Sequence, residues 1–173
     1  KGKLLLNRPG IVQHILGGWE LSASYIAQTG RFFTPSFSGT DVSYTNVYGG
    51  RPDRIGDGNL DAGSRTVAKW FDASAFVVPT TGQGRFGNAG KSILIGPGQQ
   101  TMNLAAFKDF RFTERLKLRF QGSFTNAFNH PNFGTPNANI STPSSVGTIT
   151  SIDANDYSIS GARAGLVGIR LDF

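Results

Sequence analysis

Apolar and polar residues alternate without a break at the end of the chain. One side of this stretch is apolar and consists of Gly165, Val167, Ile169, Leu171 and Phe173. The other side is mixed to polar and consists of Ala164, Leu166, Gly168, Arg170 and Asp172. A period of two predicts a β-strand with two different faces. A terminal aromatic residue in phase with the apolar face is unusual in a soluble domain, where chain ends fray into water. In a strand that spans a bilayer every backbone group must be paired. Such a strand therefore stays regular up to its last residue, as the alternation up to Phe173 suggests.

Three upstream segments show the same alternation and predict three more strands. The most regular runs from Leu116 to Thr125, with apolar residues on the even positions and Lys117 and Arg119 on the odd ones. The predicted strands lie near residues 18–31, 100–113, 115–126 and 162–173, and the connecting loops cover 32–99 and 127–161. Each strand has about the 9–11 residues that a tilted bilayer-spanning strand needs. A soluble antiparallel sandwich gives the same periodicity and stays open as an alternative.

Aromatic residues near the ends of the predicted strands favour the membrane interpretation. We assign the short connection 113–115 to the periplasmic side and the long loops to the outside, as in transmembrane barrels. This orientation predicts a lower interface belt of four aromatic residues, Trp19, Phe110, Phe112 and Phe173. It predicts an upper belt of Phe32, Phe33, Phe124 and Phe128. Two such belts are typical of a transmembrane barrel, so we expect an all-β, antiparallel barrel segment with long extracellular loops.

The same register makes two predictions about charged residues. Lys108 is in phase with the apolar face, where a lysine at mid-bilayer costs roughly 2–4 kcal/mol. It must either reach the interface with its ammonium group or sit beside a bulge, and the sequence leaves both open. Asp109 and Arg119 fall opposite each other across a turn centred on Glu114, which predicts an ion pair facing the barrel lumen.

Composition narrows the class of protein. The chain has 173 residues, no cysteine and a formal net charge of +6. No apolar run approaches the roughly 18 residues of a membrane helix. The cations are scattered, without a basic helix or an RNA-recognition motif, so we expect no nucleic-acid partner. Four strands cannot close a barrel, since the smallest barrels have about eight. We therefore expect the chain to be a piece of a longer protein.

A glycine-rich motif at residues 82–87, GQGRFG, matches the dinucleotide-binding pattern by letter. That pattern needs a helix directly after it, so that the helix N-terminus meets the phosphate. The following residues 93–98, ILIGPG, do not predict a helix. We interpret the motif as a loop and expect no cofactor.

Metal ligands and catalytic groups are also not predicted. Asp57, Asn59 and Asp61 have the spacing of a calcium loop over 57–68, but the required glycine and bidentate glutamate are replaced by alanine. A weak calcium site stays open at this point. His14 and His130 lack a partner at metal-binding spacing. We expect no metal, no catalytic set and no enzyme activity.

Several strings match a known family. Residues 17–22 read GGWELS, 28–35 QTGRFFTP, 85–90 RFGNAG and 96–98 GPG. The most specific strings are FKDF at 107–110, ERLKL at 114–118 and FTNAFNHPNFG at 124–134. Together they resemble Oar-like TonB-dependent outer-membrane transporters over nearly the whole chain.

The resemblance implies the C-terminal part of one barrel domain of about 22 strands, located in the bacterial outer membrane. The plug and the N-terminal domains of such proteins are not within residues 1–173. The last apolar face, Gly165 to Phe173, resembles the signal that the barrel-assembly machinery reads. The implied partners are outer-membrane lipid, that machinery, the TonB complex through the missing N-terminal part, and an unidentified solute. The alternatives are a structural barrel or adhesin without transport, and a secreted soluble β-sandwich binding module.

Overall fold

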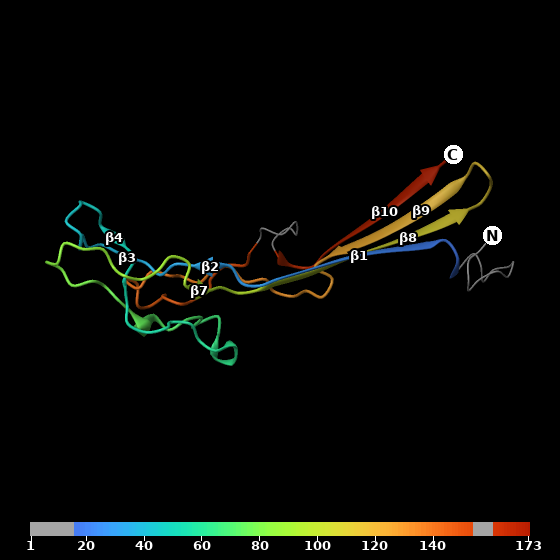
Figure 1. The fold of residues 1–173 in the computed structure, drawn as a ribbon. Coiled ribbons are helices and arrows are strands. Elements are labelled where there is room, and N and C mark those ends of the chain that lie inside the picture. The colour runs from blue at the N-terminus through green and yellow to red at the C-terminus, as the bar shows by residue number, and fades with distance from the viewer. Residues whose placement is uncertain (1–15, 154–160) are drawn as a thin grey trace. The chain divides into compact units, whose positions relative to one another are not determined.

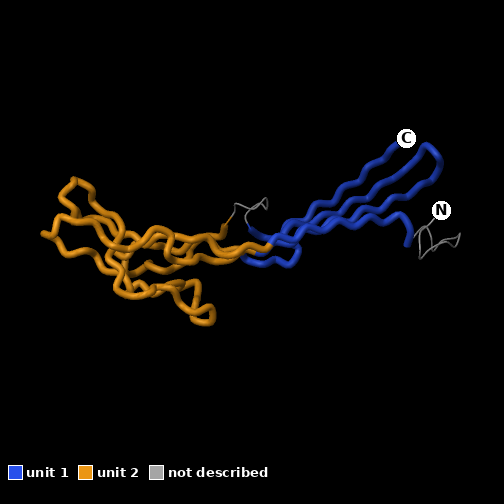
Figure 2. Tube along the Cα trace, in the orientation of Figure 1, with its two compact units in different colours: residues 1–26, 100–131, 155–173 blue, residues 27–99, 132–154 orange. Residues whose placement is uncertain are grey.

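A computed structural model describes residues 16–153 and 161–173 (Figure 1). His14 lies outside these residues. The chain divides into two compact units, drawn in blue and orange in Figure 2. The strand unit consists of residues 1–26, 100–131 and 155–173, and the loop unit consists of residues 27–99 and 132–154. Among the described residues there is no helix with the length and apolar character needed to cross a membrane.

The strand unit is built on one four-stranded sheet (Figure 1). Its strands, in spatial order, are β1 (Trp19–Gln28), β8 (Gln99–Arg111), β9 (Lys117–Thr125) and β10 (Ala164–Asp172). The pairs β8–β9 and β9–β10 are antiparallel. The expected all-β, antiparallel fold is therefore confirmed.

The observed strand bounds agree with the predicted ranges to within a few residues. The predicted turn at 113–115 agrees with the structure, because the Phe112 N–H donates to the Leu116 carbonyl at 3.0 Å and so continues the β8–β9 register up to these three residues. The Thr113 hydroxyl oxygen closes this turn by accepting the Leu116 N–H at 2.9 Å. β1 ends before the predicted residue 31 because the chain passes close to another backbone segment at Gly30. A Cβ on Gly30 would lie 1.8 Å from the Gly96 carbonyl oxygen, so only glycine fits there.

The structure excludes one of the two possibilities for Lys108. The pairing of β8 with β9 is continuous from Leu104 to Arg111, which excludes a bulge at this position. The side chain is only 4% exposed, and its ammonium group donates to the Gly17 carbonyl, just before β1. The ammonium nitrogen also lies 5.5 Å from the ring centre of Trp19 and 5.0 Å from that of Phe110. The lysine therefore extends its ammonium group along the sheet to a carbonyl and two aromatic faces.

The loop unit is a folded body with a core of its own. It contains three two-stranded sheets, formed by β2 (Phe32–Phe33) with β7 (Leu94–Ile95), β3 (Phe37–Ser38) with β4 (Gly49–Gly50), and β5 (Asp53–Arg54) with β6 (Phe76–Val77). It also contains the short 3₁₀ helices η1 (Ala62–Ser64) and η2 (Ala73–Ala75). The buried core consists of Phe33, Phe71, Ala75, Phe76, Ala89 and Leu94. The segment 32–99, predicted as a loop, thus contains short strands and a buried core.

This core corrects one prediction about the upper aromatic belt. Phe33 is buried and stacks edge-on against Phe71, with ring centres 5.6 Å apart. It belongs to the core of the loop unit and cannot face lipid. Its neighbour Phe32 remains exposed. The alternation of β2 separates the two phenylalanines, because successive side chains of a strand point to opposite sides.

Candidate functional site

The apolar side of the four-stranded sheet is continuous across neighbouring strands. Val167 on β10 pairs with Gly122 on β9, which in turn pairs with Ala106 on β8. The next row toward the β8–β9 turn is apolar on β10 and β9, with Ile169 and Phe120, and carries Lys108 on β8. The apolar positions on β10 are Gly165, Val167, Ile169 and Leu171. Val167 is 79% exposed, and Ile169 and Leu171 are exposed as well. These are the residues of the predicted assembly signal, together with Phe173, and their shared face is open rather than packed against another layer.

The four residues of the predicted lower belt lie near the β8–β9 turn. Phe110 shares a row with Leu118 and Leu171, and its ring meets Phe120 edge-on at 5.8 Å between centres. Phe112 and Phe173 follow the ends of β8 and β10 and are both exposed. Trp19 begins β1, next to the contact between the Asp109 N–H and the Gly18 carbonyl. The structure therefore groups the four residues at one end of the sheet, and their location at a membrane interface stays a prediction.

The opposite side of the sheet carries a network of charged side chains. Arg119 on β9 faces Asp109 on β8, and its Nε and Nη2 donate to the two carboxylate oxygens at 2.7 and 3.1 Å. Lys117 Nζ lies 3.0 Å from the same carboxylate, and Glu20 Oε2 lies 3.8 Å from Arg119 Nη2. The expected contact between Asp109 and Arg119 is present as a bidentate pair. Its placement toward a barrel lumen stays a prediction.

Sequence reasoning missed two members of this network. Lys117 could have been found, because it lies on the same face as Arg119 and is diagonal to Asp109 in an antiparallel pair. Glu20 could not, because its contact depends on β1 lying next to β8. Alternation along a strand does not determine which strand becomes its neighbour.

Asn126, which follows β9, is a second buried polar group that the sequence did not single out. Its side chain is 1% exposed and its φ is +46°. The amide nitrogen donates to the carbonyls of His130 and Gly161 at 2.9 and 2.7 Å, and the amide oxygen accepts the His130 N–H at 3.0 Å. Asn126 therefore ties the beginning of the predicted loop 127–161 to its end, next to β10.

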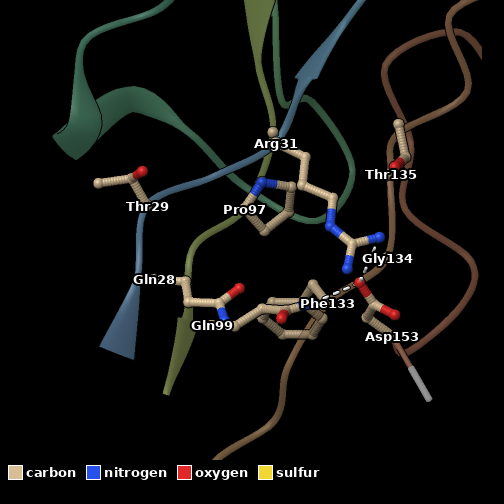
Figure 3. A pocket seen from close by; sticks show the side chains of 10 residues that line it. Gln28, Thr29, Arg31, Pro97, Gln99, Phe133, Gly134, Thr135 and Asp153 are labelled. Carbon is tan, nitrogen blue, oxygen red and sulfur yellow. Dashed lines mark hydrogen bonds and ion pairs between the residues drawn. The ribbon is translucent and has the colours of Figure 1, made fainter. Parts of the chain in front are cut away.

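A small polar recess lies in the loop unit, on residues close to the end of β1 and the start of β8 (Figure 3). Arg31 Nη1 is 3.9 Å from Asp153 Oδ2, and the Gln99 side-chain amide donates to the same carboxylate. Phe133 and Pro97 also line the recess, which has room for about one water molecule. No motif in the sequence indicated this recess, because its residues come from four separate stretches of the chain.

The residues of the motifs that matched ligand sites by letter make contacts within the loop unit. In the GQGRFG string, Arg85 donates to both oxygens of Asp53 at 2.8 and 2.6 Å. Of the candidate calcium ligands, Asp57 bonds Arg54 at 2.6 Å, and the Asn59 side-chain amide donates to the Ile93 carbonyl at 2.9 Å. Within residues 16–153 and 161–173, no group of three or more His, Asp or Glu side chains could hold a metal ion.

The Asp53–Arg85 pair is expected to make the loop unit sensitive to acid. Hydrogen bonds from Arg85, together with the Asn88 N–H at 3.0 Å, hold the pKa of Asp53 below its usual value. The aspartate side chain of an unfolded chain has a pKa of about 3.9. The lowered pKa therefore stabilises the folded loop unit above about pH 4, and this contribution is lost as the pH falls through the lowered pKa.

Hydrogen–deuterium exchange of the intact protein, corrected for the intrinsic rate at each pH, measures this effect. We expect peptides around residues 51–57 and 85–90 to lose protection in acid, and Asp53→Asn to lose it already at pH 7. Asp61→Asn is the matched control, because Asp61 is exposed. If Asp53→Asn and the unmodified protein are equally protected at pH 7, the Asp53–Arg85 pair does not stabilise the loop unit as proposed.

Comparison with known proteins agrees with the geometry. The family model described as outer membrane beta barrel domain matches residues 1–163. No curated protein and no solved structure gives a significant match to the chain. The alternative of a secreted soluble sandwich does not agree with this family, which is located in the bacterial outer membrane. The chain belongs to the outer membrane beta barrel domain family.

Proposed function

We propose that the chain forms part of the wall of a TonB-dependent transporter that moves a solute across the outer membrane. The observation that carries the proposal is the two-faced sheet, with open apolar side chains on one face and the Asp109–Arg119 network on the other. In a barrel wall the first face meets lipid and the second meets an enclosed aqueous lumen. The strings shared with Oar-like transporters support the TonB-dependent class.

The topology of the sheet suggests how the chain fits into a larger barrel. β1 and β10 are the two edges of the four-stranded sheet. Because unpaired strand edges do not occur in the hydrocarbon region, the other strands of the intact barrel would pair with these two edges. The short β8–β9 turn would lie in the periplasm, and the loop unit would lie outside the cell. We also propose that the apolar face ending at Phe173 contacts the barrel-assembly machinery.

The test of the TonB-dependent class uses the intact protein in lipid nanodiscs and the purified periplasmic domain of TonB from the same bacterium. We expect the two to bind, measured by biolayer interferometry, and a TonB deletion to abolish depletion of a solute from the growth medium. Two results together would overturn the proposal. The folded protein would not bind TonB, and deletion of TonB would leave depletion of the solute from the medium unchanged. These results would favour a structural barrel or an adhesin.

A further inference from the structure

The recess of the loop unit holds a hydrogen-bond donor and an acceptor at ion-pair distance. Arg31 and Asp153 approach to 3.9 Å, which is longer than a hydrogen bond. The Arg31 side chain is 62% exposed, whereas that of Asp153 is 12% exposed and fixed by the Gln99 amide. Figure 3 shows Arg31 and Gln99 converging on the Asp153 carboxylate from two sides.

From this geometry we propose that the recess binds hydroxyl groups of a neutral saccharide. The proposal rests on the proposed transport function and names the class of solute. A guanidinium group only donates hydrogen bonds and a carboxylate only accepts them, and a carboxylate can accept about four. A hydroxyl group does both, so one hydroxyl can accept from Arg31 and donate to Asp153. The size of the recess, about one water molecule, fits a hydroxyl group that replaces a water.

The charge of the recess argues for a neutral solute. Arg31 and Asp153 are the charged residues that line it, and their formal charges cancel. A carboxylate or phosphate that reached Arg31 would lie next to the Asp153 carboxylate, and the two like charges would repel. A saccharide hydroxyl avoids this repulsion.

The remaining lining suits the body of a sugar ring. Phe133 and Pro97 present apolar surface, against which the C–H side of a ring can pack. Thr135 and the Gln28 amide add neutral hydrogen-bonding groups on the same rim. The recess is too small for a whole ring, so we expect it to hold one or two hydroxyls of a longer saccharide.

The experiment measures binding of named oligosaccharides to the intact protein in nanodiscs by isothermal titration calorimetry. The neutral probes are maltohexaose, cellohexaose and xylohexaose, and the anionic probe is trigalacturonate. We expect at least one neutral probe to bind, and Arg31→Gln and Asp153→Asn each to weaken it by roughly 10-fold, as for the loss of one hydrogen bond to a charged group. Arg31→Lys keeps the charge but loses the planar fork, so its effect should be smaller.

Arg51→Gln is the matched control, because Arg51 is an exposed arginine of the same unit and does not line the recess. It should bind the neutral probe as the unmodified protein does. Folding of each variant is checked by the hydrogen-exchange protection of the loop-unit core around Leu94. Binding of the anionic probe alone, binding of no probe, or unchanged binding by folded Arg31→Gln would each overturn the saccharide site. The TonB assay uses no saccharide, so a failure here is distinguishable from a failure of the proposed function.

Discussion

Replacing Val167 by arginine is expected to prevent stable insertion of the intact protein into the outer membrane. Val167 lies in the middle of the apolar face of β10 and is 79% exposed, so in a barrel its side chain meets hydrocarbon. An arginine at the bilayer midplane on the lipid face costs roughly 2–4 kcal/mol. The measurement is the amount of folded, heat-modifiable barrel recovered from isolated outer membranes.

The neighbouring residue provides a matched control. Leu166 is also an apolar side chain of β10 and is 65% exposed, but it pairs with Ser123 on the face that carries the ion pairs. Leu166→Arg should therefore be tolerated, because its side chain would meet water in the lumen. The two substitutions introduce the same residue at adjacent positions and differ only in the face. Equal loss of folded barrel in both variants would contradict the assignment of the two faces.

Replacing Asn126 by aspartate is expected to destabilise the connection between β9 and β10. The Asn126 amide nitrogen donates to two carbonyls, of His130 and Gly161, and a carboxylate at this buried position would face both oxygens without a proton to donate. An uncompensated buried charge costs about 3–5 kcal/mol. We expect a lower unfolding temperature of the intact protein in detergent, together with loss of exchange protection near Gly161.

Asn129 is the control for this substitution. It also has a positive φ, +52°, and lies in the same connection, but it is exposed. Its side-chain oxygen accepts the Arg163 N–H at 3.1 Å, a role that a carboxylate also fills. Asn129→Asp should therefore unfold close to the temperature of the unmodified protein. If Asn129→Asp lowers that temperature as much as Asn126→Asp does, the effect comes from charge in the loop and the role of Asn126 is wrong.

The sequence was sufficient to predict features that depend on local periodicity. The four strands follow from alternation, because a period of two places each side chain on one face or the other. The contact of Asp109 with Arg119 follows from the position of the turn, since both residues lie at equal distances from Glu114. Once a turn is placed, the register of an antiparallel pair is determined.

Features that depend on long-range contacts could not be predicted. The core of the loop unit joins Phe33, Phe71 and Leu94, which lie far apart in the chain and show no common period. The position of the Lys108 ammonium depends on the Gly17 carbonyl, which β1 brings to β8 only in the folded sheet. The recess around Arg31 could not be predicted for the same reason, because Asp153 enters it from a distant segment. Turn-forming residues such as glycine and proline predict where a chain bends, but not what it packs against.

The central claim is that one face of the sheet meets lipid and the other meets water, and site-directed spin labelling tests it most directly. The chain contains no cysteine, so Val167→Cys and Leu166→Cys can each be labelled selectively at this strand, in an intact protein without other reactive cysteines. In liposomes, electron paramagnetic resonance then compares collisions of each label with oxygen, which concentrates in hydrocarbon, and with a water-soluble nickel chelate. We predict that the label at position 167 collides mainly with oxygen and the label at 166 mainly with the chelate. A label at 167 that collides mainly with the chelate would contradict the account.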